Sequence, residues 1–71
     1  MTNTILTARE KSVFELLIIN KSTKEIASEL GISEKTVRNH ISNVIQKLSV
    51  NSRTSAVVEL IKLKEIDIYN E

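Results

Sequence analysis

The sequence predicts an all-α fold of four helices. Proline is absent and glycine occurs once, at Gly31, so the chain lacks the turn residues that β-hairpins need. Apolar residues recur at intervals of three and four, which is the period of a helix with one buried face. A chain of 71 residues is also the size of one small domain, and we expect residues 1–71 to form it.

The first helix is expected to run from Ala8 to about Asn20. Thr7 can cap its start, and Glu10 three residues later completes the Thr-x-x-Glu pattern of a capping box. Its apolar stripe is wide and suggests that the helix is covered on more than one side. The stripe consists of Val13, Phe14, Leu16, Leu17, Ile18 and Ile19.

The second helix is expected to be short, from Thr23 to Leu30. Ser22 and Glu25 form another capping-box pattern at its start. Gly31 follows directly, at a place where helices often end with a left-handed residue that glycine adopts at low cost.

The third helix is expected to begin after Ser33, a good N-cap residue, and to continue to about Leu48. One stripe is apolar: Val37, Ile41, Val44, Ile45 and Leu48. The opposite face is polar and carries no acid: Lys35, Arg38, Asn39, Ser42, Asn43 and Gln46. A single clean stripe predicts a helix with one buried and one exposed side.

The fourth helix is expected to begin near Arg53, with Ser52 as its cap, and to end near Lys64. It has two apolar strips. One is expected to face the core and contains Ala56, Leu60 and Leu63; the other contains Thr54, Val57, Val58 and Ile61. A wide core stripe would explain both, but a surplus apolar strip on a small domain favours a protein partner.

The second and third helices have the spacing of a helix-turn-helix. Ala27 is small enough for the helices to cross closely, Gly31 permits the sharp turn, and Val37 would fill the angle between them. Such a unit presents the polar face of its second helix to the major groove of DNA. Plain helical bundles also use glycine turns, so the spacing alone leaves a structural or protein-binding bundle open.

Charge is distributed unevenly although the net charge is only +1. The segment 33–53 has four basic residues and one acid, which gives it a charge of +3. The segment 65–71 has three acids and no base, which gives it −3. This asymmetry would leave one basic region to face phosphates, although scattered solvated charges would also account for it.

Several classes of function are disfavoured. The absence of cysteine excludes disulfides and thiolate metal sites, and a lone histidine, His40, cannot build a metal centre. The chain has one Phe and one Tyr, too few for stacking on single strands. It lacks a membrane-spanning run, a signal peptide, paired catalytic groups and a phosphate-binding glycine loop. We therefore expect a non-enzyme without cofactor in the cytoplasm.

Specific motifs add a family resemblance. The segments Leu6-Thr-Ala-Arg-Glu10, Lys24-Glu-Ile-Ala27, Ser33-Glu-Lys-Thr-Val-Arg-Asn-His40 and Lys47-Leu48 resemble the LuxR/NarL-type DNA-binding domain. The resemblance extends from about Leu6 to Leu63 and is strongest to a stand-alone member that acts late in sporulation. It implies four helices, dimerisation through the fourth helix, and promoter binding that regulates transcription.

The chain departs from the family pattern in two places. The family often has glycine after the Lys-Leu pair that closes the third helix, where this chain has Ser49. Glycine is also common just after the fourth helix, where this chain continues with Lys64-Glu65-Ile66. Both departures concern helix ends rather than the DNA-reading unit.

The resemblance also implies site residues. Arg38, Asn39 and Ser42 match positions that contact base edges in the family. Arg38 is suited to guanine O6 and N7, and Asn39 to adenine N6 and N7. The candidate phosphate contacts are Lys24, Ser33, Lys35, Thr36, Lys47 and Arg53. An ordinary solvated helix face is the alternative for each of these residues.

The expected protein is thus a transcriptional regulator that binds double-stranded promoter DNA as a homodimer at the bacterial nucleoid. RNA polymerase is a further candidate partner, and neither a membrane nor a small-molecule ligand is expected. Only six residues precede Thr7, which leaves no room for a receiver domain. Two alternatives remain: a promoter-binding fragment resembling region 4 of a sigma factor, and a helical protein-interaction module.

Overall fold

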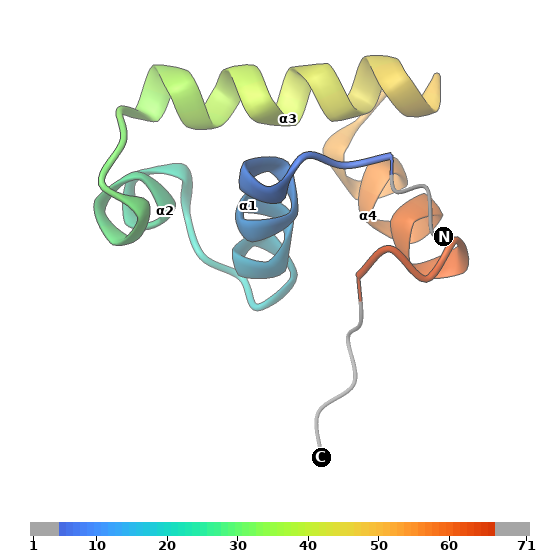
Figure 1. Cartoon of the computed structure of the whole chain (residues 1–71), viewed down its shortest axis with the longest axis horizontal. Helices are drawn as coiled ribbons and strands as arrows, with labels where there is room; N and C mark the ends of the chain where they lie inside the picture. The colour runs from blue at the N-terminus through green and yellow to red at the C-terminus, as the bar shows by residue number, and fades with distance from the viewer. Residues whose placement is uncertain (1–4, 67–71) are drawn as a thin grey trace.

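The computed structural model describes residues 5–66, and all regular structure in that range is helical. The helices are α1 (Ala8–Ile18), α2 (Thr23–Leu30), α3 (Glu34–Leu48) and α4 (Arg53–Lys62). The longest helix, α3, runs along one side of the molecule, with α2, α1 and α4 placed in turn along its length (Figure 1). This arrangement confirms the expected all-α fold of four helices.

Helix starts are set by local hydrogen bonds, as the sequence predicted. In the capping box of α1, the Thr7 hydroxyl accepts from the amide of Glu10, and the Glu10 carboxylate accepts from the amide of Thr7. Ser22 and Glu25 form the same reciprocal pair at α2. These bonds satisfy amides that have no partner within the helix.

Each helix is followed by a residue in the left-handed conformation. These residues are Asn20 (φ 71°), Gly31 (φ 70°), Ser49 (φ 56°) and Lys64 (φ 62°). After each, an amide reaches back five residues to a helix carbonyl, as in the bond of 3.2 Å from Val50 to Ile45. Ser49 and Lys64 therefore make the turns for which the family often uses glycine.

Two helices are shorter than expected. α1 ends at Ile18 rather than Asn20, and α4 ends at Lys62 rather than Lys64. The physical reason is the same in both: Asn20 and Lys64 themselves adopt left-handed backbone angles, which a right-handed helix cannot include.

The core gathers residues from all four helices and from both flanking segments. Its fully enclosed members include Phe14, Ile26, Val37 and Leu60. Leu6 before α1 and Ile66 after α4 are also buried, so the chain ends of the described range pack onto the helices. Asp67 and Glu71, which contribute to the predicted acidic tail, lie outside the described residues.

Two apolar residues are exposed where the sequence predicted burial. Leu63 was assigned to the core strip of α4, but it is 46% exposed. Its amide still donates to the carbonyl of Glu59, so Leu63 keeps the helical spacing from Ala56 and Leu60, but it lies at the very end of the helix, beyond the part of α4 that the core encloses. Ile19 was assigned to the wide stripe of α1 and is 60% exposed. Its backbone angles, φ −99° and ψ 20°, have already left the helical values.

Candidate nucleic-acid interface

The turn between α2 and α3 fixes how the two helices meet. Gly31 has φ 70° and ψ 35°, and the amide of Ile32 donates to the carbonyl of Ala27 at 3.0 Å. A Cβ atom at Gly31 would meet nothing within 4 Å, so glycine is favoured here by its backbone angles and not by space. Ala27 and Val37 are buried at the junction, as the helix-turn-helix spacing predicted.

Two hydroxyl groups form the N-cap of α3. The Ser33 hydroxyl accepts from the amide of Thr36 at 3.0 Å and donates to the Thr36 hydroxyl at 2.9 Å. Both residues were predicted to contact phosphate, and the structure shows them engaged with each other in the N-cap. Ser33 remains exposed and Thr36 is half-buried.

The polar face of α3 is open to solvent. The predicted base-contacting residues Arg38, Asn39 and Ser42 are all exposed, and the buried stripe of Val37, Ile41 and Val44 lies on the core side of the same helix. The remaining members of the polar face are exposed as well: Lys35, Asn43 and Gln46. The structure therefore brings the predicted base-contacting residues together on one accessible helix surface.

An acid borders this face, which the sequence analysis did not anticipate. The Arg38 guanidinium donates from Nη2 to Glu34 Oε1 at 3.2 Å. The two residues are four apart on the helix, and this spacing is the available sequence signal for the pair.

Lys47 lies in a different environment from the other predicted phosphate contacts. Its ammonium donates to Glu10 Oε1 at 2.5 Å and to the carbonyl of Ile5 at 3.1 Å. The Glu10 side chain is only 4% exposed, and that of Lys47 is 35% exposed. Lys47 thus joins α3 to the start of α1. No local sequence signal could reveal this pair, because its members are 37 residues apart.

The buried carboxylate of Glu10 is held in its charged form. Burial by itself would raise its pKa, but the hydrogen bonds from Lys47 and from the Thr7 amide, and the charges of Lys47 and His40, outweigh this effect. The pKa of Glu10 is therefore below its ordinary value of 4.5. His40 is half-buried on α3 and makes the smallest of these contributions to the lowered pKa of Glu10.

The remaining predicted contacts lie on other helices. Lys24 in α2 and Arg53 at the start of α4 are exposed. Another cross-helix bond was also missed: the Arg9 guanidinium of α1 donates to the carbonyl of Leu30, at the end of α2, at 3.4 Å. This bond satisfies a carbonyl that has no partner inside the helix.

The predicted dimer strip of α4 is only partly accessible. Thr54 is exposed and Val58 is 50% exposed, whereas Val57 and Ile61 are half-buried. A hollow of about 300 Å³ adjoins the strip, lined by Leu17, Ile18, Arg53, Thr54 and Val57. The strip therefore continues onto the end of α1.

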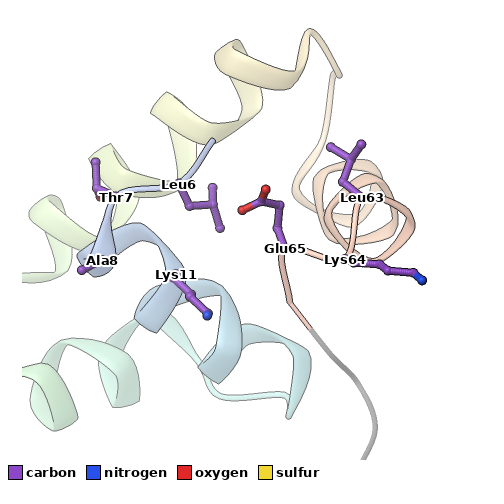
Figure 2. A pocket seen from close by; sticks show the side chains of 7 residues that line it. All are labelled: Leu6, Thr7, Ala8, Lys11, Leu63, Lys64 and Glu65. Atoms are coloured by element: carbon purple, nitrogen blue, oxygen red, sulfur yellow. The ribbon is translucent and has the colours of Figure 1, made fainter. Parts of the chain in front are cut away.

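A larger hollow of about 610 Å³ lies between the start of α1 and the segment that follows α4. The side chains of Leu6 and Glu65 point toward each other across it (Figure 2). Its other lining residues are Thr7, Ala8, Lys11, Leu63 and Lys64. Because its lining comes from these two segments, the hollow is separate from the polar face of α3.

Residues 5–66 contain neither a cluster of metal-binding side chains nor a helix that could span a membrane. No group of three or more histidine, aspartate or glutamate side chains in that range is arranged to hold a metal ion. Within the same range, the helices are too short and too polar to cross a membrane.

Comparison with known proteins decides the family. The profile of the family described as bacterial regulatory proteins, luxR family, named GerE, matches residues 4–60. The chain belongs to this family. It is a DNA-binding transcriptional regulator and not an enzyme.

Individual relatives agree with this assignment. The spore germination protein GerE of Bacillus subtilis is 64% identical over 64 residues, which cover 90% of this chain and 86% of the relative. The regulatory protein DegU of Brevibacillus brevis is 55% identical over 58 residues, which cover 82% of this chain but 25% of DegU. A solved structure of the transcription factor GerE matches with a TM-score of 0.91 and 52% identity, covering 94% of this chain and 100% of that structure.

Proposed function

We propose that this LuxR-family regulator binds promoter DNA sequence-specifically as a homodimer, with α3 of each copy in a major groove. The observation that carries the proposal is the exposed face of Arg38, Asn39 and Ser42 on a helix whose opposite side is buried. B-form DNA has a major groove wide enough for one such helix, and each base pair presents a distinct pattern of donors and acceptors there.

Two residues are suited to reading bases directly. The planar guanidinium of Arg38 can donate two parallel bonds to O6 and N7 of guanine, and the amide of Asn39 can pair with N6 and N7 of adenine. Ser42 lies one turn beyond Arg38, where its hydroxyl can either donate or accept. These contacts would supply the sequence preference.

Phosphate contacts would fix the position of the helix without reading sequence. We assign this role to the half-buried Thr36 and to exposed groups at the edges of α3 and on neighbouring helices: Lys24, Ser33, Lys35, Lys47 and Arg53. The ammonium of Lys47 uses two of its three donors on Glu10 and Ile5, so one donor is left for a phosphate.

The homodimer would form through α4. Val58 is half-exposed, and the neighbouring hollow lined by Leu17, Ile18 and Val57 offers apolar surface that a second copy could cover. A two-fold dimer places two recognition helices on one face of the duplex, and its operator would contain two related half-sites. RNA polymerase would be a further partner at the promoter.

The biological setting follows from similarity to GerE. The 64% identity to a spore germination protein supports regulation of genes expressed late in sporulation. We place residues 1–71 in one domain that acts at the bacterial nucleoid. Transcripts compared between a strain lacking the gene and its parent during sporulation would test this setting, and unchanged late transcripts would contradict it.

Selection of bound duplexes from a random-sequence pool, at near-physiological salt, tests the DNA-binding proposal. Enrichment of two related half-sites at a fixed spacing is the expected result. Enrichment of one unpaired element would instead support the monomeric reader that resembles region 4 of a sigma factor. A pool without enrichment would overturn sequence-specific binding and favour a protein-interaction module.

A further inference from the structure

We propose that Glu34 is a positioning residue for DNA recognition, which holds the Arg38 guanidinium in the orientation that reads a base. The inference rests on the proposed docking of α3 in the major groove. The two side chains are joined at 3.2 Å between Arg38 Nη2 and Glu34 Oε1, and both are accessible from the face that would meet DNA.

Folding gains little from this ion pair. The Arg38 side chain is 59% exposed and that of Glu34 is 43% exposed, so water screens their attraction. Glu34 is also the first residue of α3, where a negative charge is favourable beside the helix N-terminus. That second effect needs only a carboxylate in the first turn, and it does not require contact with Arg38.

An acid placed here would lower the affinity for DNA. A gain in selectivity would explain why the binding surface nevertheless carries one. A carboxylate beside the phosphate backbone repels it and lowers the affinity for every sequence alike. Its contact with Arg38 has another consequence, because a tethered guanidinium is less free to swing toward a phosphate of a non-cognate site. Selectivity often arises in this way, from penalties against wrong partners.

The geometry leaves Arg38 able to read a base. A guanidinium has five N–H donors in one plane, and the contact with Glu34 uses one of them at Nη2. The remaining donors can still form the paired bonds to guanine O6 and N7. Glu34 would therefore restrict the side chain without consuming the donors needed for recognition.

The test compares binding to the selected operator with binding to the same duplex carrying a substitution at the base pair that Arg38 reads. Glu34→Gln removes the charge, and Glu34→Asp keeps the charge but shortens the reach to Arg38. We expect both variants to lower the ratio of cognate to non-cognate affinity by about five-fold or more, within the range of one good base contact. The exposed acid Glu15 on α1 provides the matched control, and Glu15→Gln should leave the ratio unchanged.

Combination with Arg38→Ala separates this inference from the function on which it rests. In an Arg38→Ala background, Glu34→Gln should no longer change the ratio, because no guanidinium remains to be positioned. If Arg38→Ala removes discrimination but Glu34→Gln and Glu34→Asp keep it, the role of Glu34 is overturned and the docking of α3 stands. If Glu34→Asp alone behaves like the unaltered protein, charge and not positioning is the cause. If Arg38→Ala leaves discrimination intact, both proposals are wrong.

Discussion

The ammonium of Lys47 lies 2.5 Å from the carboxylate oxygen of Glu10, and this contact joins the last turn of α3 to the first turn of α1. Glu10 also accepts from the amide of Thr7, so one buried carboxylate serves both a helix cap and a contact between helices. The orientation of the proposed recognition helix is therefore tied to the start of the chain's first helix.

Removal of Lys47 should destabilise the fold. Lys47→Met would leave the Glu10 carboxylate buried with its charge uncompensated, and we expect a loss of about 1–3 kcal/mol in the free energy of unfolding. Urea denaturation at pH 7 measures this loss. Lys62→Met on α4 changes an exposed lysine in the same way and should cost much less. Equal effects in the two variants would show that the ion pair contributes nothing specific.

Low pH should destabilise the fold because the Glu10 carboxylate becomes protonated. Its pKa is lowered in the folded state, so its contribution is complete above the ordinary value of 4.5 and is lost as the pH falls through the folded value. Denaturation measured between neutral pH and about pH 3 should show this decline. Glu10→Gln should be less stable at neutral pH and should show a shallower decline. An unchanged decline in Glu10→Gln would assign the acid sensitivity to other carboxylates.

Replacement of Ser49 by glycine should stabilise the fold. The φ of Ser49, 56°, is strained for a residue with a side chain, and glycine relieves that strain at some cost in unfolded-chain entropy. We expect Ser49→Gly to raise the free energy of unfolding by up to about 1 kcal/mol. The same change at Ser28, exposed within α2, should lower it by roughly 0.5 kcal/mol. A loss at both positions would mean that Ser49 is not strained in solution.

Arg38 and Arg53 should affect DNA binding in different ways. Arg38→Ala should cost about 1–3 kcal/mol at the selected operator and relax the preference at one base pair. Arg53→Ala should weaken all sequences alike and reduce the salt dependence, as expected for a phosphate contact. Titration of operator and scrambled duplexes at two salt concentrations separates the two effects. An Arg38→Ala variant with unaltered operator affinity would remove α3 from the base-reading role.

A charge at Val58 tests the proposed dimer better than a charge at Val57. Val58 is 50% exposed, whereas Val57 is half-buried beside Leu17 and Ile18, so a charge at Val57 would also disturb the core. Val58→Asp should shift the protein to monomer in sedimentation while its helical circular dichroism stays the same. Ser28→Asp adds the same charge to α2 and should leave the dimer intact. A dimer that persists in Val58→Asp would place the interface elsewhere.

Local chemistry made the helix starts predictable. The capping boxes at Thr7 and Ser22 and the cap at Ser33 all form, because each joins atoms only three residues apart and needs no other part of the fold. The glycine turn at Gly31 was predictable for the same reason. The family and its DNA-binding function could likewise be inferred from short motifs in the sequence.

By itself, the sequence determined the four helices, their caps and the polar face that α3 presents. Only the tertiary structure decided that Lys47 is paired with Glu10, whereas the four-residue spacing of Glu34 and Arg38 already favours their pair on one helix. The tertiary structure also decided that α1 and α4 end early and that Leu63 is exposed. Capping and amphipathic periodicity act between near neighbours, whereas the burial of a charge depends on segments as far apart as 37 residues, which no local pattern encodes.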